Sequence, residues 1–231
     1  MSKNRQIKNI LCYGDSNTWG FVPQDLGNMQ PSDLKRYSRE ERWTGLLQEK
    51  LGDSFYVVEE GLNGRTTNLN YHIPPDRNGK TYLAPCLYSH APLDLVIFAA
   101  LGGNDFKTCF QRTAEDIRHG MAELIQVVKQ TPYGPGFTQP PQVLLISIPT
   151  PLKIAESYLD ENGVPLFSDT EKKANQLREL YASLAAETKT HFLDVSDDVP
   201  PSPIDGLHLD ESGHEKLAHL IWKKCEEIFS G

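Results

Sequence analysis

Leu95-Val96-Ile97-Phe98-Ala99-Ala100 is the stretch of this sequence that decides the fold. Its side chains are apolar at consecutive positions, so both faces of an extended segment would be apolar. Such strands are typical of parallel sheets that helices cover on both sides. A half-exposed strand would instead alternate apolar and polar residues. The stretch therefore predicts a buried strand at the centre of an α/β domain.

Four other short apolar runs are expected to be strands of the same sheet. They are Ile7–Cys12, Phe55–Glu59, Val143–Ile148 and His191–Val195. Apolar residues at helical spacing lie between the runs, each set after a possible helix start. The starts are Ser38 with Glu41, Thr113 with Asp116, Ser168 with Glu171, and Ser212 with Glu215, and Gly52 is expected to end the first helix.

The alternation of strands and helices predicts a three-layer α/β/α sandwich with a five-stranded parallel sheet. The flavodoxin-like strand order 2-1-3-4-5 is expected, in one domain that spans residues 1–231. Four segments show no periodicity and are expected to be loops that form pocket walls, subunit contacts or plain surface. These segments are Phe21–Tyr37, Thr67–Pro92, Pro132–Pro141 and Pro149–Phe167.

Composition excludes several classes of protein. The net charge of -8 argues against a nucleic-acid binder, which would present a clustered basic face. The longest apolar run is too short to cross a membrane, and no signal-peptide core follows the basic start Met1–Lys8. The four cysteines are scattered without metal-type spacing, as in reduced proteins. A cytoplasmic protein is expected.

Polar, glycine-bearing motifs follow four of the predicted strands. Ligands of open α/β sheets bind beyond the carboxyl ends of the strands, so these motifs are expected to meet at one edge of the sheet. They are Gly14-Asp15-Ser16-Asn17, Asn63-Gly64-Arg65-Thr66, Gly102-Gly103-Asn104-Asp105 and Asp205-Gly206-Leu207-His208.

These motifs contain the residue types that acyl transfer needs. A serine hydroxyl such as Ser16 requires a base, and the imidazole of His208 can take its proton and return it to the leaving group. Asp205 is the nearest acceptor in sequence for the second ring nitrogen of His208. The backbone amides of Ser16 and Gly64 and the side chain of Asn104 can form an oxyanion hole.

Other polar residues near these motifs have less specific interpretations. Asp15 and Asp105 are expected to brace their own loops, and Arg65 to form an ion pair or a subunit contact. Asp194, Asp197 and Asp198 are rival partners for His208, but Asp205 is favoured by its spacing. His214 and His219 lie five residues apart on the last predicted helix, so they are expected on its solvated surface and not in a metal site.

Ser16, Gly64, Asn104 and His208 resemble, in order along the chain, the four signature residues of the SGNH (GDSL-type) hydrolases. The resemblance implies the SGNH hydrolase fold, a Ser16–His208–Asp205 catalytic triad, and an oxyanion hole of Ser16, Gly64 and Asn104. It spans the chain from Gly14 to His208. No GxSxG motif surrounds Ser16, so the α/β-hydrolase nucleophile turn is not the match.

Further stretches resemble the aryl esterase/acyltransferase branch of this family. They are Arg42–Gly45, Glu59–Leu62, Arg65–Thr67 and Leu93–Ile97. The branch implies short-chain ester substrates, acyl transfer to alcohols, and a homo-oligomer that can be an octamer. The chain departs from the family pattern at Asn17, where leucine is common, and at Gly103, where threonine is frequent.

The sequence therefore predicts a serine esterase that acts on small aryl, sugar or short-chain esters, without metal or cofactor. Four residues beside the motifs are candidates for substrate binding: Asn17, Trp19, Phe21 and Phe106. Ordinary packing is the alternative for the three aromatic side chains. A flavodoxin-like mononucleotide-binding module is the competing function, and a silent structural subunit is a third, but both leave Asp205 and His208 without a role.

Overall fold

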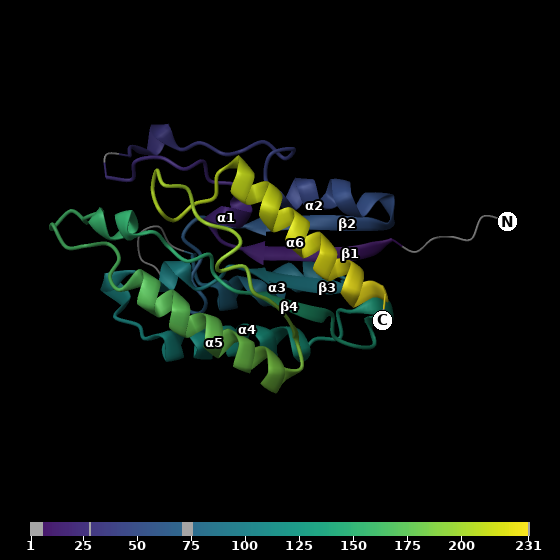
Figure 1. The fold of residues 1–231 in the computed structure, drawn as a ribbon. Coiled ribbons are helices and arrows are strands. Elements are labelled where there is room, and N and C mark those ends of the chain that lie inside the picture. Colours follow the sequence, from purple (N-terminus) through teal and green to yellow (C-terminus); the bar gives the residue numbers. More distant parts are fainter. Residues whose placement is uncertain (1–6, 28, 71–75, 231) are drawn as a thin grey trace.

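Five parallel strands form one sheet in the computed structural model, which describes residues 7–27, 29–70 and 76–230 (Figure 1). The strands are β1 (Lys8–Gly14), β2 (Phe55–Gly61), β3 (Leu95–Ala99), β4 (Gln142–Ile146) and β5 (His191–Leu193). Their order is β2-β1-β3-β4-β5 and every pairing is parallel, which confirms the predicted topology. Each strand end lies within two residues of its predicted position.

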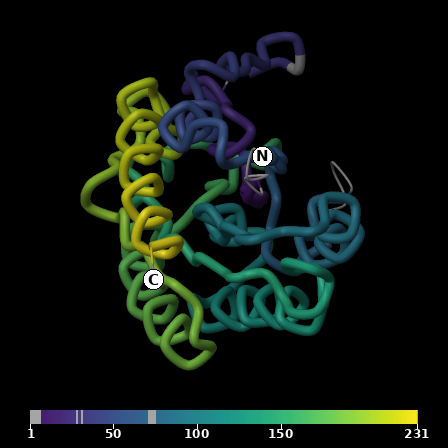
Figure 2. The backbone as a smooth tube through the Cα atoms, turned by 90° about the vertical axis from the view of Figure 1, so that its right-hand side faces the viewer, coloured from purple at the N-terminus to yellow at the C-terminus, as the bar shows by residue number. Residues whose placement is uncertain are grey.

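Helices cover both faces of this sheet (Figures 1 and 2). They are α1 (Ser16–Trp19), α2 (Trp43–Leu51), α3 (Gly79–His90), α4 (Ala114–Lys129), α5 (Thr170–Thr188) and α6 (Glu211–Ser230). Helices α3, α4 and α5 pack on one face, and α2 and α6 on the other. None of the described helices combines the length and apolar composition needed to span a bilayer.

The two faces of the central strand β3 contribute to separate hydrophobic cores. Val96 and Phe98 pack against the α3–α5 layer, whereas Leu95 and Ile97 pack against α2 and α6. All five β3 residues are buried, as the apolar stretch predicted. Burying apolar area on both faces is the main stabilising contribution of such a strand.

Two of the predicted helix signals are confirmed. Thr113 and Asp116 form a reciprocal capping box at the start of α4, with nitrogen-to-oxygen distances of 2.9 and 3.2 Å. Gly52 follows α2 with φ +67°, and its N–H donates to the Gln48 carbonyl. Both signals act within a few residues of chain, which is why the sequence reveals them.

The other three predicted helix starts are wrong in position, because residues other than the predicted ones bind the first amides of these helices. The first N–H of α2, at Trp43, donates to His214 Nδ1 on α6 at 3.3 Å, and Ser38 lies in a turn before the helix. Glu156 accepts from both the amide and the hydroxyl of Thr170 at the start of α5. Asp210, rather than Ser212, accepts from the amide of Gly213 in α6.

Helix α3 lies within Thr67–Pro92, where the sequence predicted no regular element, so that prediction is wrong. The helix contains Pro85 and lacks a clear apolar stripe, which hid it from periodicity arguments. Asn78 starts it, since its Oδ1 accepts from the amides of Lys80 and Thr81 at 3.0 and 3.3 Å. Residues 71–75 of the same segment, and residue 28 of Phe21–Tyr37, lie outside the described residues.

Two glycines at the carboxyl ends of paired strands make room for α1. Gly14 and Gly61 are register partners in β1 and β2. A Cβ on Gly61 would lie 2.1 Å from the Trp19 nitrogen, and one on Gly14 would lie 2.0 Å from Thr18 Oγ1. Helix α1 therefore rests directly on the backbone of the strand ends.

His214 is fully buried between α6 and α2, and not on the solvated surface where the sequence placed it. Its Nδ1 accepts from Trp43, and its ring packs edge-on against Tyr37 at 5.2 Å. Burial is the main cause that lowers the pKa of His214 to about 4, with Arg42 also lowering it and Asp210 opposing. His219, in contrast, is exposed.

The substitution Gly61→Ala is expected to lower the free energy of unfolding by about 1–3 kcal/mol, because the added methyl collides with backbone that has little room to move. Chemical denaturation measures this change. Gly103→Ala is the matched control, since a Cβ there meets only Ile148 Cγ2 at 3.9 Å. Equal stability of the two variants would contradict the close approach of α1 to the sheet.

The pKa of His214 predicts a pH dependence of stability. The folded-state value is about 4, below the unfolded value near 6.5, so the unfolded chain binds more protons between these values. The free energy of unfolding is therefore expected to fall by about 3 kcal/mol from this group as pH drops through that range. His214→Asn keeps an acceptor for the Trp43 amide but cannot titrate, and should flatten the pH profile. His219→Asn should leave it unchanged.

Candidate active site

Ser16 lies at the carboxyl end of β1, in the first turn of α1. Asp15 precedes it, and its Oδ1 accepts from the amide of Asn17 at 3.0 Å. Gly20 ends the turn in the left-handed region with φ +91°. Asp15 therefore braces its loop as predicted. Burial raises the pKa of Asp15 to about 6, although the bond from the Asn17 amide lowers it.

Ser16, His208 and Asp205 form a chain of hydrogen bonds at this edge of the sheet. His208 Nε2 lies 2.9 Å from Ser16 Oγ, and His208 Nδ1 lies 2.8 Å from Asp205 Oδ2. Ser16 and His208 retain 8% and 9% exposure, so both can be reached from one side, whereas Asp205 is fully buried. Each of the three side chains therefore lies within hydrogen-bonding distance of the next, as the sequence predicted.

Asp205 is held as an ionised acceptor. Its Oδ1 accepts from the amides of Leu207 and His208, each at 2.9 Å. Burial raises the pKa of Asp205, but the hydrogen bonds and charge of His208 and these amides outweigh burial, and the pKa is lowered. A rival acceptor, Asp194, is occupied by other partners, which are Ser147, Ser196 and Arg178.

The imidazole of His208 is oriented by an aromatic ring as well as by hydrogen bonds. Phe21 stacks on it with the ring centroids 4.1 Å apart and the planes 25° apart. Phe21 reaches this position because the chain turns back after α1, where the Phe21 amide donates to the Ser16 carbonyl at 3.0 Å. The stacked ring also shields one face of the imidazole from water.

Asn17 holds the backbone on both sides of His208. Its Nδ2 donates to the Leu207 carbonyl at 3.3 Å, and its Oδ1 accepts from the Leu209 amide at 2.9 Å. Both polar ends of the side chain are thus used within the protein. Asn17 also borders the cavity, so its role in substrate binding stays a prediction, while its amide group ties α1 to the loop that carries His208.

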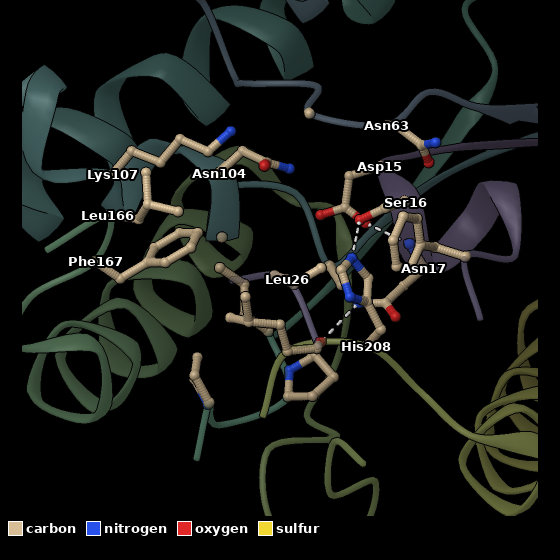
Figure 3. A pocket seen from close by; sticks show the side chains of 18 of the residues that line it. Asp15, Ser16, Asn17, Leu26, Asn63, Asn104, Lys107, Leu166, Phe167 and His208 are labelled. Atoms are coloured by element: carbon tan, nitrogen blue, oxygen red, sulfur yellow. Dashed lines mark hydrogen bonds between the residues drawn. The ribbon is translucent and has the colours of Figure 1, made fainter. Parts of the chain in front are cut away.

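Ser16 and His208 open into a cavity of about 230 Å³ (Figure 3). Gly64 and Asn104, the predicted oxyanion-hole residues, line the same cavity. Gly64 has φ +77°, a conformation that glycine adopts without strain. Asn104 lies in a 3₁₀ turn (Gly103–Phe106) after β3, and Figure 3 shows it facing Ser16 across the cavity.

The structure does not place Trp19 or Phe106 in the lining of this cavity, although the sequence suggested both for substrate binding. Trp19 packs under the Arg36 guanidinium, 4.8 Å from its ring centroid. Phe106 is 1% exposed and belongs to the core beneath α3–α5. Packing partners outside the motifs fix both side chains.

Other side chains, which sequence reasoning did not single out, form the remaining walls. The apolar ones come mostly from two of the four predicted loop segments, Phe21–Tyr37 and Pro149–Phe167, and Lys107 stands beside Asn104 (Figure 3). Together with Phe21 and Ala100, the apolar wall consists of Leu26, Met29, Ile148, Pro149, Pro151, Leu166, Phe167 and Leu207. Their position in long loops indicated that these segments could line a pocket, but no local sequence pattern indicated which of their residues do so.

The loops that carry Gly64 and Asn104 are joined by buried polar contacts. Asp105 accepts from the amide and hydroxyl of Thr67 at 2.9 and 2.6 Å, and it pairs with Arg112 at 2.7 Å. Asp105 thus braces its loop, as predicted. Arg65, predicted to form an ion pair or a subunit contact, is 1% exposed and donates to the carbonyls of Gly14 and Glu60, so it caps strand ends inside the protein.

Comparisons with known proteins agree with this geometry. The GDSL-like lipase/acylhydrolase family model matches residues 12–216. No curated protein matches the chain.

Three solved structures share both fold and sequence with the chain. The native aryl esterase of M. smegmatis is 38% identical, with a TM-score of 0.85, over 95% of this chain and 99% of its own. Est24, a carbohydrate acetylesterase from Sinorhizobium meliloti, is 37% identical, with a TM-score of 0.83, over 96% and 100%. A putative arylesterase from Agrobacterium tumefaciens str. C58 is 33% identical, with a TM-score of 0.81, over 96% and 100%. The chain therefore belongs to the GDSL-like lipase/acylhydrolase family.

Proposed function

We propose that this protein is a serine esterase that cleaves small carboxylic esters through an acyl-enzyme on Ser16. The observation that supports it most is the hydrogen-bonded chain from Asp205 through His208 to Ser16, which opens into a cavity. Similarity to an aryl esterase and to a carbohydrate acetylesterase makes aryl esters and acetylated carbohydrates the candidate substrate classes.

Acylation follows from the positions of three side chains. Ser16 Oγ attacks the ester carbonyl while His208 Nε2, 2.9 Å away, takes the hydroxyl proton. Asp205 holds the other ring nitrogen at 2.8 Å, which fixes the tautomer and stabilises the imidazolium that forms. The imidazolium then protonates the leaving alkoxide, and the alcohol departs.

The tetrahedral intermediate carries a negative charge on the former carbonyl oxygen. The Ser16 and Gly64 amides and the Asn104 side chain are the proposed donors to this oxygen, since all three residues line the cavity. Water, or a second alcohol, then attacks the acyl-enzyme with His208 as base. Attack by an alcohol makes the same site an acyltransferase.

The cavity favours small substrates. Its volume of about 230 Å³ lies below the range of about 300–1,000 Å³ that drug-sized ligands occupy. Its apolar wall suits a short acyl group, which gains by leaving water. The proposed substrates are therefore acetyl and other short-chain esters.

The competing mononucleotide-binding function is not favoured, because it gives no role to the buried Asp205–His208 pair beside Ser16. Nor does a silent structural subunit account for that pair. The homo-oligomer and the cytoplasmic location stay predictions, and light scattering of the purified protein measures the first.

The decisive variant is Ser16→Ala. It is expected to reduce kcat/KM for p-nitrophenyl acetate and for a peracetylated sugar by at least about 10⁴-fold, because Ser16 has the only hydroxyl among the described residues that line the cavity. Turnover at the wild-type rate by a folded Ser16→Ala protein would refute the proposal.

A matched pair of carboxylate variants tests the role of Asp205. Asp205→Asn is expected to lower kcat by about 10³- to 10⁴-fold, because the amide no longer stabilises the imidazolium of His208. Asp194→Asn removes a carboxylate bound to Ser147 and Arg178, outside the cavity, and should retain most of the activity. A larger loss of kcat in Asp194→Asn than in Asp205→Asn would instead identify Asp194 as the carboxylate that acts with His208.

Asn17→Leu tests whether Asn17 positions His208 or contacts substrate. Loss of its bonds to Leu207 and Leu209 is expected to lower kcat about tenfold with little change in KM, because the imidazole is less well aligned. A raised KM with unchanged kcat would indicate a substrate contact instead. Steady-state kinetics with p-nitrophenyl acetate separates the two outcomes.

A further inference from the structure

Glu60, Cys86 and His90 converge at a place that the esterase mechanism does not use. A carboxylate oxygen, the thiol sulfur and a ring nitrogen of these residues all lie within 4.8 Å of one another. None of the three lines the cavity that contains Ser16. The cluster therefore has its own surroundings and needs its own explanation.

Regular secondary structure holds the three side chains in place. Cys86 and His90 are four residues apart on α3, so they lie on the same face of the helix. Glu60 lies near the end of β2, which is an edge strand of the sheet. Two ligand atoms thus come from a helix and one from the strand beside it.

The cluster is closed on one side and open on the other. Cys86 is 1% exposed, whereas the side chains of Glu60 and His90 are 19% and 30% exposed. His90 Nε2 lies 2.8 Å from Glu60 Oε1, and the hydroxyl of Tyr82 lies 3.5 Å from the same oxygen. A second cavity, lined in part by Glu60, Tyr82 and Pro85, borders the cluster on the side of Glu60.

We propose that Glu60, Cys86 and His90 bind a divalent transition-metal ion of the zinc type, with a solvent molecule as the fourth ligand. A thiolate, an imidazole and a carboxylate are the ligands that Zn²⁺ takes in proteins, whereas Ca²⁺ and Mg²⁺ prefer oxygen alone. The ion takes the place of the proton between His90 and Glu60, so His90 binds as the neutral tautomer with its proton on Nδ1. The thiol proton of Cys86 is released to solvent.

The charges of the proposed ligands match the charge of a divalent ion. A carboxylate and a thiolate together neutralise a divalent ion, and Arg65 is the positive group that faces the cluster.

The proposed ion ties α3 to the edge strand β2. Binding to the folded state alone raises stability by mass action. Because the cluster is separate from Ser16 and His208, the ion is expected to stabilise the fold without changing ester hydrolysis. The inference thus does not depend on the proposed function.

Titration of the purified, chelator-treated protein with Co²⁺ tests the proposal. We expect one equivalent to bind, with a thiolate-to-cobalt charge-transfer band and the visible bands of a four-coordinate ion. Zn²⁺ should abolish these bands and raise Tm. The variants Cys86→Ser and Glu60→Gln should lose the charge-transfer band and the Tm rise. Far-UV circular dichroism spectra that match the wild type show that they are folded, and their hydrolysis of p-nitrophenyl acetate should be unchanged.

Two variants provide matched controls. Cys109→Ser removes the exposed cysteine, and His119→Gln removes an exposed histidine that lies 3.9 Å from Glu123. Both should bind Co²⁺ like the wild type. Absence of a charge-transfer band in the wild-type protein would overturn the proposal, as would its persistence in Cys86→Ser or its loss in Cys109→Ser.

Discussion

A hydrogen bond of 2.9 Å between Ser16 and His208 joins residues that are 192 positions apart, and the geometry of the site depends on it. The bond requires α1 to lie close to the sheet and the His208 loop to lie over α1. Gly14 and Gly61 satisfy the first condition, because no side chain separates α1 from the strand ends. Asn17 satisfies the second by bonding on both sides of His208.

Two buried carboxylates near this bond have hydrogen-bond partners that hold their loops in place. Asp205 and Asp105 are fully buried, and each accepts hydrogen bonds from backbone amides and from a cationic or ionisable side chain. Buried carboxylates without such partners would be strongly destabilising. The same bonds therefore stabilise the loops and hold the proposed catalytic groups in position before substrate binds.

The sheet gives different environments to two clusters of reactive side chains. At the carboxyl ends of β1 and β3, glycine-bearing turns expose Ser16 and Asn104 to a cavity. Beside the edge strand β2, the regular spacing of α3 brings Cys86 and His90 onto one face next to Glu60. Loops thus supply the groups proposed to react, and regular elements supply those proposed to bind an ion.

The amino-acid sequence by itself determined the features that depend on neighbouring residues. The apolar run at β3 predicted a strand buried on both faces, and the motif order along the chain predicted which residues reach one edge of the sheet. Asp205 and His208, three residues apart, also meet within a local turn. Such features are readable because periodicity and short turns involve only a few consecutive residues.

Only the tertiary structure decided which side chains act together across the chain. It turned Asn17 toward Leu207 and Leu209, directed Phe106 into the core, and buried His214 against Trp43. It also revealed helix α3, whose apolar residues do not form a continuous stripe along one side of the helix. The physical reason is that packing and hydrogen bonding between distant segments fix side-chain direction, and no local pattern encodes those partners.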